Sequence, residues 1–356
     1  MSAFFIGADG GLYTVERGAD GAWRPATLAG AAGLAPGAAP VAAARLSGGL
    51  TAAALVGRDG AIYTDCPTAD TAPMRATEQA AAAPGSRIAL AQAGAALVAV
   101  TADPVQPNTP IYTFEVHNPC DGGTLAQLDT TLILAPPAPP PPGAHLAAAG
   151  LADGELGIFY IDTTGALQAL WLRPTGAWNA SRLTAPGTST PGAGLAVTPN
   201  ADAASGRLSL LYTAHSGLVY LAHPLPGGGL AGQPAPLPQT AATRAPDGAA
   251  LAVSADVSPG SGVIVGYVAQ SGAVAAVFID ASGAAQDPVV LTGGGLALPG
   301  SSLAAGAAAD EIDFVCGTAT GHPVRIKVPR PGTGPGDAIP VGPQIQTAAM
   351  TTFAMS

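Results

Sequence analysis

Three basic side chains stand at the ends of short, Ala-rich segments, where they could act on a small molecule. Arg45 ends one such segment, Arg87 begins a second and His145 begins a third. If these segments converge on one axis, the three side chains would share a funnel and could bind a carboxylate or polarise a carbonyl. The other interpretation is that each side chain is a separate, solvated strand end.

Acidic residues and catalytic motifs add little to this alternative. Acidic groups occur at Asp153/Glu155 and at Asp310/Glu311/Asp313, each just before an apolar stretch. Their oxygens suit calcium, but neither group lies in an EF-hand loop, so we expect them to solvate turns and discourage edge pairing. No HExxH, GxSxG, Walker A or CxxC motif is present. The sequence therefore assigns no metal, no cofactor and no catalytic residue outside the three basic side chains.

The three cysteines are odd in number and far apart in the chain. They are Cys66, Cys120 and Cys316, and no CxxC pair exists, which excludes a zinc ribbon and argues against a disulfide framework. Cys316 lies inside an apolar stretch, so we expect it to be buried. Cys66 and Cys120 adjoin turns, where a thiol nucleophile would find no neighbouring base in the sequence.

A repeated hairpin is the element that must position all of these residues. Each copy has an apolar strand, a small turn with Gly and a second apolar strand, as in FFIGADGGLYTV at Phe4–Val15 and ALVGRDGAIYTD at Ala54–Asp65. In six of the seven copies the Gly follows Asp, Thr or Ser. This pattern is typical of a hairpin turn that requires a positive φ angle.

A second recurrent element, small and Ala-rich, accompanies each hairpin. Its marker residues are 47 to 58 residues apart, at Val41, Ile88, Leu146, Leu195, Leu251, Leu303 and Met350. The step from Met350 through the C-terminus and back to Val41 is again 47 residues, so the period closes on itself. Four short antiparallel strands per unit, repeated seven times, predict an all-β, seven-bladed propeller in which the C-terminal strand completes the N-terminal blade.

We expect one propeller domain over residues 1–356. Its predicted blades are residues 347–356 with 2–30, then 38–80, 86–134, 144–186, 193–240, 249–293 and 301–342. Crowding near the axis explains why the innermost strands are rich in Ala. The proline-rich stretch 137–142 is then interpreted as a stiff connector inside the ring rather than as a domain boundary.

Composition excludes several classes of protein. The chain has 48 Gly and 35 Pro in 356 residues, with 48% hydrophobic and only 10% charged residues, which is wrong for a disordered chain. It has no run of about 20 apolar residues that could span a membrane. A net charge of −10 with a single lysine, Lys327, argues against nucleic acid and anionic lipid as partners. The N-terminus lacks a basic region and a cleavage site, so we expect a soluble, cytoplasmic protein, with leaderless export as the alternative.

The first unit contains a longer motif: a G-x-D-G-x-L-aromatic hairpin, then G-x-W, then a Leu–Gly ending. Its residues are Gly7, Asp9, Gly10, Leu12, Tyr13, Gly21, Trp23, Leu28 and Gly30. Thr164, Gly165, Leu167, Gly176, Trp178 and Leu183 form a second copy, and Gly57, Asp59, Gly60, Ile62 and Tyr63 match its front half. With this motif the chain resembles the seven-bladed propeller lectins of the bacterial fucose-binding kind and the wider tachylectin–tectonin-like group.

This resemblance implies glycan binding in clefts between blades or near the loop face. An aromatic ring would cover the C–H face of a sugar while charged side chains bond its hydroxyls. The candidate ligand-binding residues are Tyr13, Glu16, Trp23 and Arg24 in the first blade, Trp171, Arg173 and Trp178 in the fourth, and Tyr220 in the fifth. The other interpretation of the aromatic residues is that they cap blade edges and cover the core.

The chain departs from these lectins in one respect. They repeat their polar ligands in several blades, whereas a combination of Arg, Glu and Trp is convincing here only in the first blade. Loss of repeated sites removes the basis of avidity and favours one specialised site, or none. The sequence thus predicts non-catalytic recognition of a glycan or another small polar ligand, with an oligomer left open. The alternatives are an intracellular enzyme with its site in the axial funnel and a protein-interaction scaffold.

Overall fold

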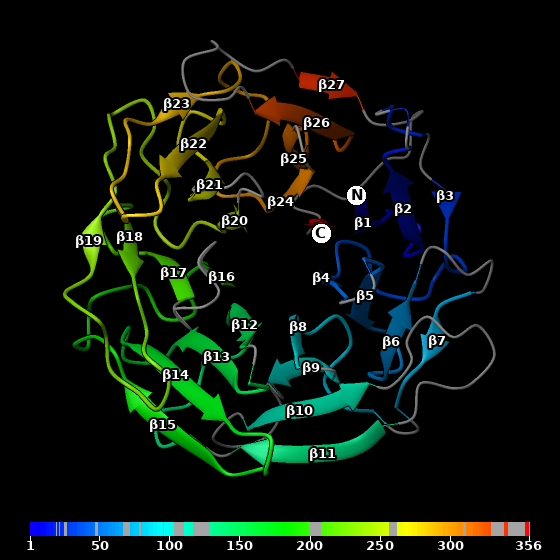
Figure 1. Cartoon of the computed structure of the whole chain (residues 1–356). Coiled ribbons are helices and arrows are strands. Elements are labelled where there is room, and N and C mark those ends of the chain that lie inside the picture. Colours follow the sequence, from blue (N-terminus) through cyan, green and yellow to red (C-terminus); the bar gives the residue numbers. More distant parts are fainter. Residues whose placement is uncertain are drawn as a thin grey trace.

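The computed structural model of the chain is a ring of β-sheets (Figure 1). It describes all residues except 19, 21, 25–26, 47–48, 67–71, 78–79, 95, 103–109, 117–127, 135, 152, 200–207, 256–261, 309–310, 329–337, 341–352 and 356, and for 128–134, 308, 311, 338–340 and 353–355 it describes the backbone alone. Within these residues, 28 strands form seven antiparallel sheets of four strands each. The predicted seven-bladed, all-β propeller is confirmed.

Each blade runs from an innermost strand near the axis to an outermost strand at the rim. The innermost strands are β28 (Phe353–Met355), β4 (Val41–Arg45), β8 (Ile88–Ala93), β12 (Leu146–Gly150), β16 (Leu195–Pro199), β20 (Ala252–Ala255) and β24 (Leu303–Ala308). The second strands are β1 (Ser2–Ile6), β5 (Thr51–Val56), β9 (Ala96–Ala102), β13 (Leu156–Ile161), β17 (Leu208–Thr213), β21 (Val263–Val268) and β25 (Glu311–Gly317). The third strands are β2 (Leu12–Glu16), β6 (Ile62–Asp65), β10 (Ile111–Val116), β14 (Leu167–Leu172), β18 (Val219–Ala222), β22 (Val274–Ile279) and β26 (Pro323–Val328). The outermost strands are β3 (Thr27–Leu28), β7 (Met74–Arg75), β11 (Leu128–Leu134), β15 (Trp178–Arg182), β19 (Ala235–Pro236), β23 (Val289–Val290) and β27 (Ala338–Pro340).

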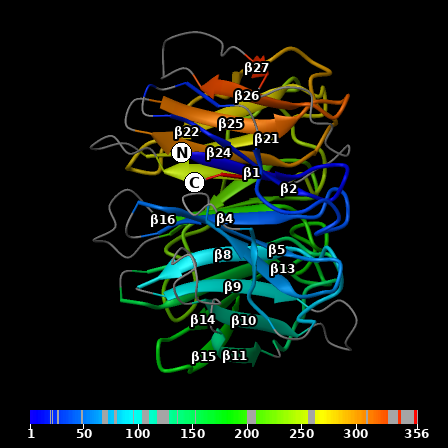
Figure 2. The ribbon, with the colours of Figure 1, turned by 90° about the vertical axis from the view of Figure 1, so that its right-hand side faces the viewer.

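The ring is closed by the two ends of the chain. The C-terminal strand β28 pairs antiparallel with the N-terminal strand β1, with Phe5 opposite Phe353 and Ala3 opposite Met355. Figure 2 shows from the side that the two ends of the chain lie close together. We number the blades from this junction, so that blade 1 contains β28, β1, β2 and β3, blade 2 contains β4 to β7, and blade 7 contains β24 to β27. Closure places blade 1 directly beside blade 7.

Glycines make the tight turn between the second and third strands. Gly10 and Gly165 both have a φ angle of +77°, and a Cβ atom on either would collide with a carbonyl oxygen of the following connection. A residue with a side chain would therefore be both strained and blocked there. The predicted positive-φ hairpin turns are confirmed at these positions.

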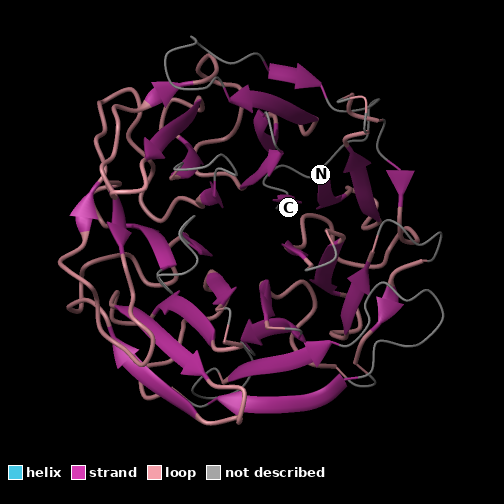
Figure 3. Cartoon of the chain, in the orientation of Figure 1, coloured by secondary structure: helices cyan, strands magenta, loops and turns pink. Residues whose placement is uncertain are grey.

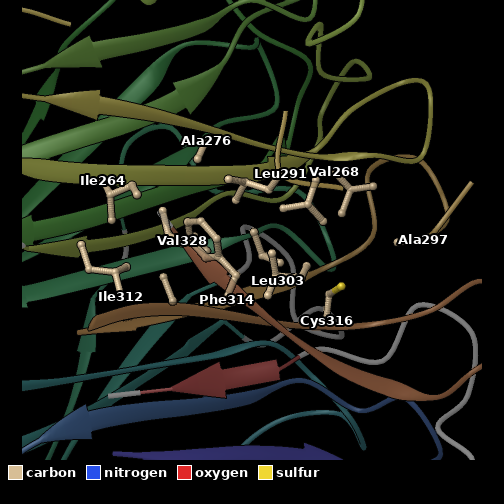
Figure 4. Packing of buried hydrophobic residues seen from close by; sticks show 14 of the residues in the cluster. Ile264, Val268, Ala276, Leu291, Ala297, Leu303, Ile312, Phe314, Cys316 and Val328 are labelled. Carbon is tan, nitrogen blue, oxygen red and sulfur yellow. The ribbon is translucent and has the colours of Figure 1, made fainter. Parts of the chain in front are cut away.

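The hydrophobic core lies between the blades, because both faces of each sheet are buried. Successive side chains of a strand point to opposite faces, so Phe4, Ile6 and Leu12 of blade 1 pack on blade 2. Phe5 and Val15, one residue away, pack on blade 7 instead. Figure 4 shows the corresponding core between blades 6 and 7.

Figure 3 shows strands and connections only in the described part of the chain. It follows that no helix among the residues placed by the structure is long and apolar enough to cross a membrane. The short strands and many turns account for the high Gly and Pro content of the sequence.

Candidate functional site

An ion pair is buried on the face of blade 7 that packs against blade 1. Asp313 lies on β25 and Arg325 on β26, and the Arg325 Nε donates to the Asp313 Oδ1 at 2.8 Å. Asp313 is 0% and Arg325 9% exposed. Charges are rarely buried to this extent without a specific partner, because removing them from water is costly. The buried pair therefore makes the interface of blades 7 and 1 a candidate for a functional site.

The side chain of Trp23, from blade 1, contacts both members of this pair. Its indole packs on the small apolar cluster between blades 1 and 7, which includes Phe5 and Val315. The Trp23 Nε1 donates a long hydrogen bond of 3.4 Å to the Asp313 Oδ2. The Arg325 Cζ lies 5.8 Å from the centroid of the indole, within the range of a cation–π contact. An aromatic ring, an acid and a base thus meet across two blades.

The same positions in the other blades carry no charge. Blades can be compared by the register of their second and third strands, counted from the first pair at the hairpin, which is Gly317 with Pro323 in blade 7. The equivalents of Asp313 are Ser2, Ala52, Val98, Gly157, Ser209 and Ile264. The equivalents of Arg325 are Thr14, Thr64, Thr113, Ala169, Leu221 and Ala276. Among these described positions, the charged pair occurs at the interface of blades 7 and 1 alone.

This arrangement suits a ligand with an apolar face and several hydroxyl groups. Arg325 is the member of the pair that retains some exposure, and its guanidinium supplies donors for charge-assisted bonds, which are stronger than neutral ones. The fully buried Asp313 carboxylate holds that guanidinium in position. The indole supplies a flat apolar surface. Lys327 is exposed, lies opposite Asp313 and is at the next position on the same face of β26 as Arg325.

The first-blade residues proposed from the sequence are divided between two faces of the sheet. Tyr13 lies on the blade 7 side with Trp23, where its ring stacks on Phe5 at 5.6 Å and its hydroxyl donates to the Asp9 Oδ2 at 2.9 Å. Burial, and then the bond to Asp9, raise the pKa of Tyr13. Glu16 lies on the opposite face, toward blade 2, because it is an odd number of residues from Tyr13.

Arg24 is exposed in the turn that follows β2. A Cβ atom placed on Gly18 would meet the Arg24 Nη2 at 3.0 Å and also the Asp20 carboxylate, so both side chains lie over Gly18. Tyr13, Glu16, Trp23 and Arg24 therefore do not form one cluster, and only Trp23 reaches the Asp313–Arg325 pair.

The fourth-blade residues do not converge either. Trp171 is fully buried in the core between blades 4 and 5 and packs edge-on against Phe159 at 5.7 Å. It is a core residue and cannot contact a ligand, which corrects the role proposed for it. Arg173 is exposed, with its Nε 3.9 Å from the Glu155 Oε1. Trp178 is 37% exposed and occupies the position of Trp23 in its own blade, paired with Leu172.

Tyr220 of the fifth blade repeats the arrangement of Tyr13. Its ring stacks on Tyr212 at 5.6 Å, as Tyr13 stacks on Phe5, and it lies beside the outer strand β19. The repetition of this stack in two blades indicates a structural role, because a ring that lies on its cross-strand neighbour covers the sheet.

Two of the three basic residues near the axis are brought together. The Arg87 Nη1 donates to the His145 Nδ1 at 3.2 Å, and the Arg87 Nε donates to the Gly143 carbonyl oxygen at 3.1 Å. Burial, and then the charge of Arg87, lower the pKa of His145 to about 3, so its imidazole is neutral near pH 7. Arg45 is exposed at the end of β4 in another blade. Arg87 thus links blade 3 to blade 4 by hydrogen bonds, and these bonds go to protein atoms.

The acidic groups behave in two different ways. The Asp153 Oδ1 accepts from the Glu155 backbone amide at 3.0 Å and so caps a turn, as expected. The expectation that Asp313 solvates a turn is wrong, since it is buried against Arg325. Asp310 and the side chain of Glu311 lie outside what the structure describes. No group of three or more His, Cys, Asp or Glu side chains with metal-binding geometry is found among the described residues.

The cysteines correct another expectation. Cys66 is disulfide-bonded, so it is not a thiol nucleophile, and the count of three cysteines did not exclude a disulfide. Cys120 lies outside the described residues. Cys316 is a free, buried thiol, as expected, and burial raises its pKa to about 12.

Sequence reasoning missed Arg325 and misassigned Asp313. The signal was present in DFVCG and PVRIKV, where a charged residue occupies a position that alternation assigns to a buried face. It could not be recognised without knowing which face of blade 7 meets blade 1, because both faces of a propeller sheet are buried.

Comparisons with known proteins bear on the fold. No protein-family model and no curated relative matches the chain. The BP39L lectin from Burkholderia pseudomallei is similar in structure, with a TM-score of 0.76 and 22% identity over 94% of both chains. The SapL1 lectin in complex with α-methyl fucoside has a TM-score of 0.58 and 16% identity, over 88% of this chain and 100% of that one. A mutant of the Aleuria aurantia lectin in complex with α-methyl-L-fucoside has a TM-score of 0.54 and 13% identity, over 97% and 92%. The chain therefore has the propeller fold that these lectins have.

Proposed function

We propose that this chain is a non-catalytic carbohydrate-binding protein whose site lies at the interface of blades 7 and 1. The observation that carries the proposal is the buried Asp313–Arg325 pair with Trp23 of the adjoining blade over it. A pyranose ring presents an apolar C–H face and a set of neighbouring hydroxyls. The indole matches the first, and the Arg325 guanidinium, held in place by the buried Asp313, matches the second.

The rigidity of the site supports binding of a small, weakly apolar ligand. Arg325 and Asp313 hold each other in place before a ligand arrives, and Trp23 is anchored in the cluster between the blades. Less side-chain freedom is then lost on binding, which leaves more of the interaction energy for affinity.

An α-L-fucoside is the ligand class we propose first. The SapL1 and Aleuria aurantia structures to which the chain is similar contain α-methyl fucosides. Because the charged pair occurs at one of the compared interfaces, we expect one such sugar per chain, and therefore no gain in avidity from repeated sites.

Binding of α-methyl-L-fucoside and of a glycan array to the purified chain tests this proposal. The informative variant carries Asp313→Ser and Arg325→Thr together, which installs the residues that blade 1 has at the same positions, Ser2 and Thr14. We expect it to keep the circular dichroism of the fold and lose sugar binding. The control is Arg75→Gln, which removes an exposed arginine paired with Asp59 at 3.1 Å and should bind as the parent does.

Two results would contradict the proposal. One is that no glycan or monosaccharide binds at millimolar concentration. The other is that the double variant binds sugar as tightly as the parent, which would place binding elsewhere in the ring.

A further inference from the structure

The opposite face of blade 1 carries a second set of polar groups within the core. Asp65 lies at the end of β6, three residues after Ile62, which forms the first pair at the hairpin of blade 2 with Val56. The equivalent residues of the other blades are apolar and buried: Val15, Phe114, Leu170, Ala222, Val277 and Ile326. An ionisable side chain in this position needs a physical reason, because burying a carboxylate is unfavourable.

Asp65 faces blade 1. It lies opposite Ala53 and on the same face of the sheet as Tyr63, and both of these residues pack on blade 1. On blade 1, the face that meets them carries Leu12 and continues with Thr14 and then Glu16.

The repeat of the fold places these positions at one interface between neighbouring blades. Between blades 6 and 7, the equivalents of Ser2, Thr14 and Asp65 share one core cluster, as Ile264, Ala276 and Ile326 (Figure 4 labels the first two). Between blades 4 and 5, the equivalents of Thr14, Glu16 and Asp65 share another, as Ala169, Trp171 and Ala222. Since the blades are related by the same register, Ser2, Thr14, Glu16 and Asp65 belong to the same interface, between blades 1 and 2, and the charge of Glu16 acts on Asp65.

Two of these polar side chains have atoms that no other group satisfies. Asp65 is 4% exposed and its Oδ2 has no hydrogen-bond partner, and Thr14 is 3% exposed and its Oγ1 has none either, among the residues that the structure places. Buried polar atoms are almost always bonded to protein or to something held there. An oxygen-rich interface with unsatisfied oxygens from both blades is suited to a bound cation.

The charges that act on Asp65 agree with this assignment. Burial raises the pKa of Asp65 to about 6, the Cys66 amide opposes the shift, and the charge of Glu16 adds to it. Within the described part of the chain, no cationic side chain is among the groups that shift this pKa. Glu16 also acts on the α-amino group of Met1, whose own pKa is lowered by burial, by Arg45 and by Arg17, and raised by Glu16.

We infer that the interface of blades 1 and 2 binds a hard divalent cation, Ca²⁺, through the carboxylates of Asp65 and Glu16 and the hydroxyls of Thr14 and Ser2. All four side chains offer oxygen atoms as ligands. Calcium accepts six to eight oxygen ligands in flexible geometry, so water would supply the remaining ligands. Zinc would prefer nitrogen or thiolate ligands, and no His side chain or free thiol lies among these residues. The ion would link blade 1, in which the two ends of the chain pair, to blade 2.

Calcium titration of the EDTA-treated full chain, followed by calorimetry and by the midpoint of thermal unfolding, tests this inference. We expect the midpoint to rise with calcium concentration, since an ion that binds only the folded state stabilises it by mass action. Asp65→Asn removes a ligand charge and a buried charge at once, so the variant should fold but bind calcium at least about tenfold more weakly. Thr14→Val should give a smaller loss of calcium affinity.

The matched control is Glu155→Gln, which neutralises a buried carboxylate of blade 4 and should leave the calcium response unchanged. An absence of calcium binding by the parent chain at millimolar calcium would overturn the inference. So would an equal calcium response in the parent and in Asp65→Asn. Because sugar binding is measured at the other face of blade 1, failure of either proposal leaves the other intact.

Discussion

The indole nitrogen of Trp23 lies 3.4 Å from the Asp313 Oδ2, although 290 residues separate the two along the chain. The contact exists because β28 pairs with β1 and so brings the first blade against the last. The proposed sugar site is thus a product of ring closure, and it forms only when the whole propeller has folded.

The first prediction concerns the stability of the buried pair. Arg325→Thr removes the guanidinium and leaves the Asp313 carboxylate buried, which should lower the free energy of unfolding by about 3 kcal/mol. The double variant with Asp313→Ser should lose less than this single variant, because it leaves no buried charge behind. Urea unfolding measures both. If the double variant is less stable than Arg325→Thr alone, the prediction is wrong. The unpaired, buried Asp313 carboxylate would then not be the main cause of the lost stability.

The second prediction concerns the pH dependence contributed by Asp65. Its folded pKa, about 6, lies above the ordinary value near 3.8, so the folded state holds a proton that the unfolded state releases. Between about pH 4 and pH 6, the contribution of Asp65 to the free energy of unfolding should therefore fall as the pH rises, by on the order of 2 kcal/mol. The comparison is made between the parent and Asp65→Asn in EDTA.

The difference in stability between the two proteins should favour Asp65→Asn at pH 7 and shrink toward pH 4. A constant difference across this range would show that Asp65 does not titrate with a raised pKa. Added calcium at pH 7 should reverse the order by stabilising the parent alone.

The third prediction concerns the thiols. Cys66 is disulfide-bonded and Cys316 is free, so the denatured, non-reduced protein should contain fewer than three reactive thiols, with Cys316 among them. In the native state that thiol should react slowly, because it is buried and burial raises its pKa to about 12. A disulfide is typical of proteins in an oxidising compartment. A count of three thiols in protein taken directly from its native source would contradict this prediction.

The fold could be predicted from the sequence because it depends on local features that repeat. Gly10 and its counterparts mark hairpin turns, and the Ala-rich strands recur with a period that closes across the termini. Each of these features is dictated by backbone geometry and by crowding near the axis. These features can be recognised in the sequence without knowing which blades are neighbours.

The candidate site could be predicted only in part. Trp23 was identified because its motif is local, but Asp313 and Arg325 come from the other end of the chain and resemble ordinary strand residues. Trp171 fills the core, but the sequence does not distinguish it from a ligand-binding residue, since an aromatic residue on a strand has the same sequence pattern on either face. Glu16 was grouped with Tyr13 by proximity in sequence, while alternation along β2 sends it to the opposite interface.

The most direct test of the central claim compares Trp23→Ala with Trp178→Ala in binding to a fucose matrix. The two tryptophans occupy the same position in blades 1 and 4, but the residues that stand in place of Asp313 and Arg325 opposite Trp178 are Val98 and Thr113. We predict that Trp23→Ala loses retention at least about tenfold, as expected for an aromatic anchor at a binding site, and that Trp178→Ala keeps it. Equal retention by both variants, or a loss confined to Trp178→Ala, would contradict the assignment of the site to the interface of blades 7 and 1.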